Sequence, residues 1–378
     1  MRVLIAGAGL AAQRCCAALR RLGHDGPITL VGDEPLLPYD RPPLSKEWLA
    51  GTADEAALLL RPADWYARHG IDVRLATAAV ALDAGARRVR LADGEELAYD
   101  RLLIATGAGA RTLPGSGRYE NVGVLRSAAD AAALRERLQP GARIVVVGAG
   151  FIGLEAAATA RALGAAVTVL DAAAAPLQAI VGPRLGGWFA AMHREEGVQL
   201  ALGTGVDGFE AAGDSVRAVR LADGRRLECD AVLVGIGVRP ATGWLTGSPL
   251  EGDGVRVDAA ARSSVAGVFA AGDAARGAHW EAASRQGAAA AHGMLGLEPP
   301  PSAPAGFWSD QYGTRVQLVG DPRGATELHV SGEPAQRDFI ALHIRDGIVV
   351  AGLLAGRPRA LPDLRQRIGQ PHQERNIA

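Results

Sequence analysis

Two short apolar runs, far apart in the chain, each lead directly into the same Gly-Ala-Gly turn. The first is Val3–Ala6 before Gly7, and the second covers residues 144–147 before Gly148. A continuous apolar run of this length, bounded by glycine, predicts a strand buried on both faces, as strands of parallel sheets are. A stretch of helical character follows each turn, so each segment predicts a strand, a tight turn and a helix.

The two segments continue to match beyond their turns. Each predicted helix closes on Leu-Gly, 16 residues after the first glycine, at Gly23 and at Gly164. A second apolar strand follows in both segments, at Ile28–Val31 and at residues 167–170, and each of these strands leads to an acidic residue.

The match extends further along the chain. Residues 91–97 and 221–227 both read Leu-Ala-Asp-Gly at their start and end in leucine, and an aspartate stands nine residues after each start. Each aspartate precedes a predicted strand that runs into a glycine loop containing Gly107 in one case and Gly237 in the other. Two copies of one α/β unit explain these repeated spacings most simply.

The Gly-x-Gly-x-x-small turn has a specific chemical use. Its first glycine permits the tight turn, its second lets the backbone approach a pyrophosphate, and its third position must be small so that helix and strand touch. The pyrophosphate then meets free N–H groups and the positive end of the helix dipole. Two such turns predict two bound dinucleotides. The residues expected to face them are Gly7, Gly9, Leu10, Ala11 and Ala12 in the first copy and Gly148, Gly150, Ile152 and Gly153 in the second.

The acid after the second strand of each copy is expected to hydrogen-bond an adenosine ribose. This acid is Asp33, with Glu34 beside it, in the first copy and Asp171 in the second. Asp171 would repel a 2′-phosphate, and residues 172–178 offer no arginine to compensate. The second copy is therefore predicted to prefer NADH over NADPH, although Asp171 could also do no more than start a turn.

Composition and charge exclude several classes of function. The 378 residues carry a formal charge of -1, with 21% charged and 48% apolar residues, which argues against a disordered chain and a dedicated nucleic-acid binder. No uncharged run exceeds 12 residues, fewer than the ~18 that a membrane-spanning helix needs. The apolar N-terminus is better explained by the predicted strand and turn than by a secretion signal. We expect a cytoplasmic protein, as a monomer or a homodimer.

Three residue types refine this picture. The 3 cysteines show no C-x-x-C spacing, which makes a redox-active disulfide or a cysteine-rich metal site unlikely and fits a reducing compartment. The 8 histidines show no metal-ligand spacing, so no metal is predicted. Lys46 is the only lysine, against 39 arginines, and this isolation makes it a candidate for a specific role.

Residues 268–273, a strand ending in Gly272-Asp273, resemble the FAD-contacting motifs of the two-dinucleotide flavoprotein reductases, as do residues 105–108. Residues 38–46 and 307–313 look specifically like the oxygenase-coupled ferredoxin reductases of the putidaredoxin and rubredoxin reductase type. The ferredoxin reductases of this type belong to the pyridine nucleotide-disulfide oxidoreductase-like flavoproteins.

The resemblance covers nearly the whole chain and implies an α/β fold. It implies two Rossmann-like dinucleotide-binding domains and a small C-terminal α+β interface domain. The expected limits are 1–110 and 240–306 for the FAD-binding domain, 111–239 for the NAD-binding domain and 307–378 for the interface domain, with a proline-rich linker at 299–304.

The resemblance also assigns site residues. Lys46, Glu155 and Trp308 are implied as catalytic, with Lys46 near flavin N5, Glu155 beside the nicotinamide and Trp308 close to the isoalloxazine. Positions implied to contact the flavin or its phosphates are Asp33, Arg41, Lys46, the backbone at Ala79, Thr106, Gly107, Arg111, Arg126, Gly272, Asp273 and Trp280. Two departures from the family pattern are Gly109-Ala110, where a proline is usual, and Gln178, where arginine is common.

The implied function is electron transfer from NADH through FAD to a small iron–sulfur ferredoxin or rubredoxin that serves a P450 or a non-haem oxygenase. Lys46 would supply a compact positive charge beside the reduced flavin, and Glu155 would pair with it. A basic C-terminal stretch could steer an acidic ferredoxin or could simply be a solvated face. It contains Arg357, Arg359, Arg365 and Arg367.

Two alternatives stay open from the sequence. A disulfide-type reductase or NADH oxidase of the same architecture would want a reactive cysteine near the flavin, and residues 38–51 contain none. A redox-dependent NADH-sensing interaction protein would share the cofactors and differ in turnover.

Overall fold

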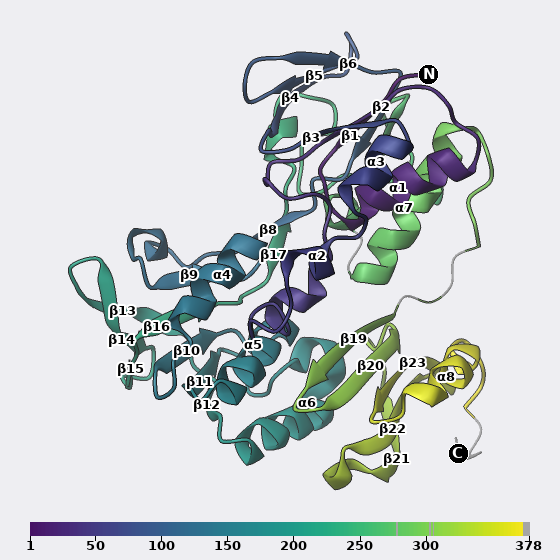
Figure 1. Ribbon diagram of the computed structural model, residues 1–378. Helices are drawn as coiled ribbons and strands as arrows, with labels where there is room; N and C mark the ends of the chain where they lie inside the picture. Colours follow the sequence, from purple (N-terminus) through teal and green to yellow (C-terminus); the bar gives the residue numbers. More distant parts are fainter. Residues whose placement is uncertain (277–278, 302–303, 305, 373–378) are drawn as a thin grey trace. The chain divides into compact units, whose positions relative to one another are not determined.

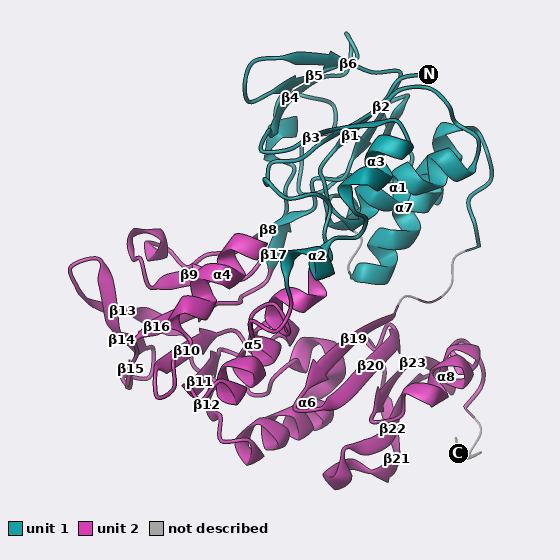
Figure 2. Cartoon of the chain, viewed as in Figure 1, with its two compact units in different colours: residues 1–40, 54–109, 238–303 teal, residues 41–53, 110–237, 304–378 magenta. Residues whose placement is uncertain are grey.

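The computed structural model describes residues 1–276, 279–301, 304 and 306–372. The chain forms two compact units, each assembled from separate segments (Figure 2). Unit 1 contains residues 1–40, 54–109 and 238–303, and unit 2 contains residues 41–53, 110–237 and 304–378. The segment predicted as a linker, 299–304, and the last residues of the predicted interface domain lie partly outside the described residues.

Unit 1 is built on a parallel sheet in the strand order β18-β7-β1-β2-β3. Figure 1 labels β1, β2 and β3 of this sheet. Its strands are β1 (Val3–Ala6), β2 (Ile28–Val31), β3 (Ile71–Arg74), β7 (Arg101–Ile104) and β18 (Val268–Ala270). Around this sheet are α1 (Leu10–Arg21), α2 (Glu55–Leu58), α3 (Ala63–Arg68), α7 (Trp280–Met294), β4 (Ala79–Asp83), β5 (Arg88–Leu91), β6 (Glu96–Ala98), β8 (Ala108–Ala110) and β17 (Val238–Pro240).

The apolar run in β1 is explained by burial on both faces of this sheet. Ile5 packs into a core shared with α1 and α7, which lie side by side. Its neighbour Leu4 points to the opposite face and packs with residues of the antiparallel β4-β5-β6 sheet. Since successive strand residues face opposite sides, a strand covered on both faces must be apolar at every position.

The second copy forms the centre of unit 2. Its parallel sheet has the order β12-β11-β10-β16-β9. The strands are β9 (Val122–Val124), β10 (Arg143–Val147), β11 (Ala166–Asp171), β12 (Gln199–Leu202) and β16 (Ala231–Val234). They are accompanied by α4 (Ala128–Arg137), α5 (Phe151–Ala162), α6 (Gln178–Glu195) and the antiparallel sheet β13 (Val206–Ala212), β14 (Ser215–Leu221) and β15 (Arg226–Glu228).

The strand orders confirm the duplication predicted from the spacings. In each copy the first strand is central, the second and third lie on one side of it, and the strand before the glycine loop lies on the other side. Helix α6 is interrupted at Gly182, whose φ of 80° is non-helical, and Pro183 follows it. A glycine and a proline in sequence account for the kink.

The C-terminal part of unit 2 is an antiparallel sheet in the order β19-β20-β23-β22-β21. Its strands are β19 (Gly306–Gln311), β20 (Thr314–Gly320), β21 (Glu327–Glu333), β22 (Asp338–Arg345) and β23 (Ile348–Ala355), and α8 (Leu361–Arg367) packs on β20 and β23. Leu364 anchors α8 in a core with Ile340 and Leu354. The expected α/β architecture with a C-terminal α+β part is confirmed. No helix among the described residues is both long and apolar enough to cross a membrane.

Short 3-10 helices connect these elements. They are η1 (Pro42–Ser45), η2 (Ser116–Arg118), η3 (Gly243–Leu245), η4 (Gly272–Ala275), η5 (Pro334–Gln336) and η6 (Pro358–Ala360).

Candidate functional site

The first glycine of each turn is fixed by backbone geometry and by space. Gly7 has a φ of 114° and Gly148 a φ of 110°, values that residues with side chains rarely adopt. A Cβ on Gly7 would lie 2.1 Å from the carbonyl oxygen of Ala105, and one on Gly148 would lie 2.3 Å from that of Gly235. The two copies therefore make the same turn, each against the corresponding glycine loop of its own copy.

The space in front of α1 and α5 fits a pyrophosphate. Gly9 and Gly150 stand at the N-caps of these helices, and no side chain of the described residues caps either end. A Cβ on either glycine would meet no described atom within 4 Å. The first amides of each helix thus face open space, with the dipole directed outward, which is what an anionic phosphate requires.

The third position brings helix and strand together in both copies. A Cβ on Gly153 would lie 2.1 Å from the carbonyl oxygen of Gly148, while Ala12 is fully buried in the first copy. Next to the second turn, Ile152 and Ile236 keep 45% and 37% of their surface exposed. These side chains offer apolar surface beside the turn that was predicted to bind NADH.

The acids behave differently in the two copies. Asp171 ends β11 and accepts hydrogen bonds from the backbone amides of Ala149, at 2.6 Å, and Ala173, at 2.8 Å. It therefore organises the turn, as its alternative role required, and a carboxylate has further lone pairs for a ribose hydroxyl. Asp33 is exposed, and its neighbour Glu34 accepts a hydrogen bond of 2.6 Å from the hydroxyl of Tyr39.

Most of the remaining candidates of unit 1 lie on loops at the carboxyl ends of its strands or at the start of α7, while Ala79 begins β4. Asp273 lies in η4 directly after β18. Trp280 begins α7, donates from its indole nitrogen to Asp40 at 2.5 Å, and has the guanidinium of Arg14 5.9 Å from its ring centre. Thr106 donates to the carbonyl oxygen of Ala241 at 2.8 Å.

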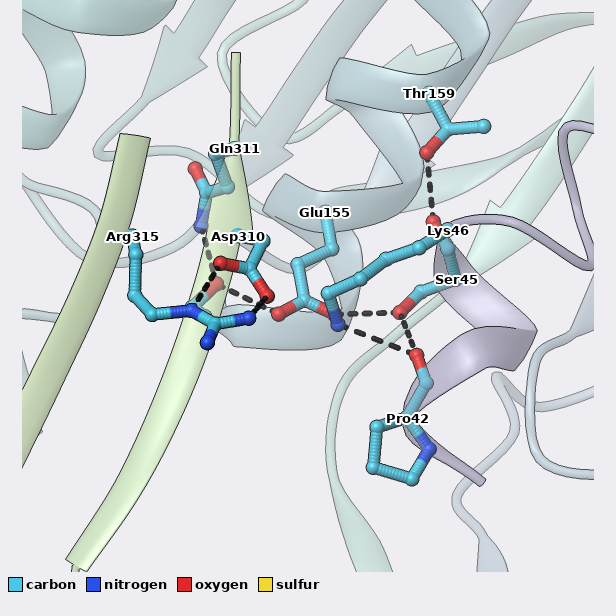
Figure 3. Close-up of polar contacts among 9 residues, drawn as sticks. Pro42, Ser45, Lys46, Glu155, Thr159, Asp310, Gln311 and Arg315 are labelled. Atoms are coloured by element: carbon cyan, nitrogen blue, oxygen red, sulfur yellow. Dashed lines mark hydrogen bonds and ion pairs between the residues drawn. The ribbon is translucent and has the colours of Figure 1, made fainter. Parts of the chain in front are cut away.

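The solitary lysine lies in unit 2, in an ion pair with Glu155 (Figure 3). Lys46 follows η1, and its Nζ lies 2.6 Å from Oε2 of Glu155 and 3.2 Å from the carbonyl oxygen of Pro42. Its side chain is 12% exposed and that of Glu155 is 4% exposed. Burying such a pair brings little net stability, because desolvation offsets the attraction. A pair in this setting is more easily explained by function.

Further hydroxyl groups hold the pair in place. Ser45 donates to Oε2 of Glu155 at 2.5 Å, and Ser309 of β19 donates to Oε1 at 2.6 Å. Thr159, one turn after Glu155 on α5, donates to the carbonyl oxygen of Ser45 at 2.7 Å and so ties η1 to the helix. Neither serine is among the residues predicted from the sequence, although each lies within a segment that carries the family resemblance.

Trp308 lies on the other face of β19 from Ser309. Phe307 shares the face of Ser309 and contacts Phe151 of α5, with ring centres 4.2 Å apart. Alternation along the strand then directs Trp308 away from this side. Within unit 2, therefore, the structure joins Lys46 and Glu155 but does not bring Trp308 to them.

Other candidates of unit 2 lie in the segments that connect its helices and strands. The guanidinium of Arg41 donates to the carbonyl oxygen of Arg126, and the backbone amide of Arg111 donates to the carbonyl oxygen of Gly237 at 2.9 Å. Arg357, one of the basic C-terminal residues, pairs with Asp338 at 2.6 Å.

The cysteines, all of them among the described residues, are buried and unpaired. Burial raises the pKa of Cys15 well above its usual value, that of Cys16 to about 12 and that of Cys229 to about 11. A buried thiol with a raised pKa is a poor nucleophile. The described residues also hold no group of histidine, cysteine and acidic side chains that could bind a metal.

Comparison with known proteins identifies the family. Residues 1–287 match the family model of pyridine nucleotide-disulphide oxidoreductases, and residues 306–376 match that of the reductase C-terminal domain. The ferredoxin–NAD(+) reductase component of the biphenyl dioxygenase system of Paraburkholderia xenovorans (strain LB400) is 39% identical over 363 residues, 92% of this chain and 88% of that protein. Putidaredoxin reductase CamA of Pseudomonas putida is 37% identical, over 94% of this chain and 89% of its own length.

Solved structures give the same result. A chain in the crystal structure of the covalent putidaredoxin reductase–putidaredoxin complex superposes with a TM-score of 0.93 and 35% identity, over 98% of this chain and 93% of that one. This protein is therefore an oxidoreductase that uses FAD and NAD(H), as its fold, its two glycine turns and these relatives show. The chain belongs to the pyridine nucleotide-disulphide oxidoreductase family, among its ferredoxin–NAD(+) reductases.

Proposed function

We propose that this protein transfers electrons from NADH through FAD to a small iron–sulfur ferredoxin, or rubredoxin, that serves an oxygenase. The observation that carries the proposal is the buried Lys46–Glu155 pair next to the second glycine turn, in a chain whose cysteines are all buried. The relatives named above, components of dioxygenase systems and a putidaredoxin reductase, support it.

The proposal assigns the cofactors to the two copies. FAD is assigned to the turn of the first copy and NADH to that of the second, with the domain limits expected from the sequence. FAD, when bound, supplies the conversion between a two-electron hydride and single electrons. The protein contributes position and charge.

The role proposed for Lys46 is to present a fixed positive charge to the flavin. Its ammonium group has two anchoring acceptors, Glu155 and the carbonyl oxygen of Pro42, so its position is defined before any substrate arrives. Glu155 is in turn held on both carboxylate oxygens. The same carboxylate is proposed to orient the nicotinamide.

The preference for NADH is proposed to rest on Asp171. Its carboxylate is fixed by two backbone amides, so it cannot move aside for the charge of a 2′-phosphate.

We also place the protein in a reducing cytoplasm, which suits free cysteines.

Turnover with an iron–sulfur acceptor tests the proposal. NADH-driven reduction of cytochrome c is measured with and without putidaredoxin, the protein bound in the similar complex structure. The expected result is rapid reduction that depends on the iron–sulfur protein. Fast oxygen consumption without it would support an NADH oxidase instead. A long-lived reduced protein with slow turnover under every condition would support an NADH-sensing protein.

A further inference from the structure

A buried chain of hydrogen bonds leads from Glu155 into the interior of unit 2. Ser309 Oγ lies 2.6 Å from Glu155 Oε1, and Gln311 Nε2 lies 2.9 Å from Ser309 Oγ. His193 Nε2 of α6 lies 2.8 Å from Gln311 Oε1, and the Tyr312 hydroxyl lies 2.8 Å from His193 Nδ1. Nothing in the proposed cofactor chemistry uses these four residues, so the chain needs its own explanation.

The direction of every link follows from the ionised carboxylate at one end. A carboxylate only accepts, so Ser309 must donate its single proton to Glu155 and must accept from the amide nitrogen of Gln311. The amide oxygen then faces His193, whose Nε2 must carry the proton. A neutral ring leaves Nδ1 as an acceptor, so Tyr312 donates to it. All the donors thus point toward Glu155 (Figure 3 shows the Glu155 end of this hydrogen-bond chain as far as Gln311).

Burial keeps these groups in the protonation states that this direction needs. Ser309 and His193 are 0% exposed and Gln311 is 1% exposed. Burial lowers the pKa of His193 to about 4, with a smaller opposing effect from its bond to Gln311. Burial also raises the pKa of Tyr312, so the phenol keeps its proton. At neutral pH the side chains of this hydrogen-bond chain are therefore uncharged donors.

The backbone conformation of Tyr312 is a second, independent observation that supports a specific role for this chain of hydrogen bonds. Tyr312 and Gly313 join β19 to β20 with φ values of 51° and 73°, the two-residue turn that favours asparagine or glycine at its first position. A tyrosine there is strained. Its ring packs edge-on against that of His193, 5.1 Å between centres, and lies 5.8 Å from the guanidinium of Arg337. These contacts offset the strain and hold the hydroxyl on His193.

We propose that Ser309, Gln311, His193 and Tyr312 are positioning residues that set the orientation and charge of Glu155. With Oε1 held by Ser309, the carboxylate cannot rotate, and Oε2 stays on Lys46 and Ser45. The amide of Gln311 cannot pass a proton onward, so the chain orients the carboxylate and does not conduct protons. This inference rests on the proposed function, because it takes Glu155 to act in reduction by NADH.

Substitution of Ser309 tests the link nearest to Glu155. Ser309→Ala removes the donor, and we expect flavin reduction by NADH in stopped-flow experiments to slow about tenfold at unchanged FAD content. Because the carboxylate loses one of its hydrogen bonds, the pH dependence of the reduction rate should change as well. Ser309→Thr restores a hydroxyl and should return the rate to within about twofold of the wild type.

A matched pair of histidines separates positioning from packing. His343 of β22 is also buried with a lowered pKa, and its Nε2 has no hydrogen-bond partner among the described residues. His193→Phe should slow flavin reduction and shift its pH profile in the same direction as Ser309→Ala. His343→Phe, the same substitution outside the chain, should leave both unchanged, whatever it does to thermal stability.

The tautomer of His193 provides a readout that does not depend on activity. In the holoenzyme labelled with ¹⁵N-histidine, the ring signals lost in His193→Phe should show a neutral imidazole protonated at Nε2 between pH 8 and pH 6. A proton on Nδ1 would reverse the chain and overturn the proposal. So would a Ser309→Ala variant with wild-type rate and pH profile, or a Ser309→Thr variant as slow as Ser309→Ala.

These results are separable from the proposed function. Flavin reduction by NADH requires no acceptor protein, so a wild-type protein that reduces its flavin but not putidaredoxin contradicts the proposed function alone. The variant comparison then still stands or falls on its own results.

Discussion

The two copies of the dinucleotide-binding unit differ most clearly five residues after their second glycine. At that position α1 carries Arg14 and α5 carries Glu155. Arg14 is half-buried with its guanidinium 5.9 Å from the ring centre of Trp280, while Glu155 is buried and accepts from Lys46 and two serines. The first glycines of the turns before them have nearly the same φ, 114° at Gly7 and 110° at Gly148.

This difference distinguishes the residues that form the repeated fold from the residues proposed to act in the reaction. The turn is dictated by backbone sterics that apply equally to both copies. The partners of Glu155 are Ser45 of η1, Lys46 directly after it, and Ser309 of β19. These segments belong to neither the repeated strands nor the repeated helix. The site around Glu155 is therefore built with segments that lie outside the repeated strands and helix.

The largest expected effect tests the shared frame. Gly148→Ala forces a Cβ to 2.3 Å from the carbonyl oxygen of Gly235 at a φ of 110°, and it should lower the free energy of unfolding by about 4 kcal/mol. Urea unfolding measures this. Gly187→Ala in α6, where a Cβ would meet no described atom, is the control and should change little. Equal effects of the two substitutions would contradict a steric requirement.

The next largest effect tests the divergent position. Glu155→Gln leaves the buried Lys46 without its counter-charge and should cost about 3 kcal/mol of unfolding free energy, because a buried charge is left uncompensated. Arg14→Gln removes a half-buried charge from the equivalent position and should cost about 1 kcal/mol or less. Similar losses for both variants would remove the energetic distinction between the copies.

The acidic residues after the second strands, Asp33 and Asp171, should differ in their effect on the preference for NADH over NADPH. We expect the wild-type protein to favour NADH over NADPH by about 100-fold in kcat/KM for flavin reduction, because Asp171 faces any 2′-phosphate. Asp171→Asn removes the charge and should reduce this ratio to about tenfold or less. Asp33→Asn in the first copy should leave the ratio unchanged, and an NADPH preference in the wild type would overturn the assignment.

The last effect concerns acid stability in unit 2. Since the folded pKa of His193 lies near 4, below its ordinary value of 6.5, the unfolded chain binds the extra proton first as the pH falls. Stability from this group is complete above about pH 7 and should fall by about 2 kcal/mol between pH 7 and pH 5. His193→Phe should remove that part of the slope in urea unfolding. An unchanged slope would show that folding does not lower the pKa of His193.

The repeated frame could be predicted from the sequence because its causes are local. Val3–Ala6 had to be apolar throughout to lie between two covered faces, and Gly7 had to be glycine for its turn. Lys46 and Glu155 were identified through the family resemblance, since their contact joins residues 109 positions apart.

The chain from Ser309 to Tyr312 could not be predicted in the same way. His193 lacks metal-ligand spacing and reads as an ordinary residue of α6. Its role depends on how β19 packs against α5 and α6, which no local pattern records. The serines at 45 and 309 carry no charge or unusual spacing, so only the packed structure shows that both face Glu155. Trp308 was singled out instead, from the same strand.

The most direct test of the account is the rate of flavin reduction by NADH in Lys46→Arg. The variant keeps the charge but replaces a compact ammonium with a planar guanidinium that does not fit the buried position between Glu155 and Pro42. We predict a rate at least about tenfold lower than that of the wild type, with FAD content and thermal stability preserved. An unchanged reduction rate would contradict the claim that Lys46 acts beside the flavin.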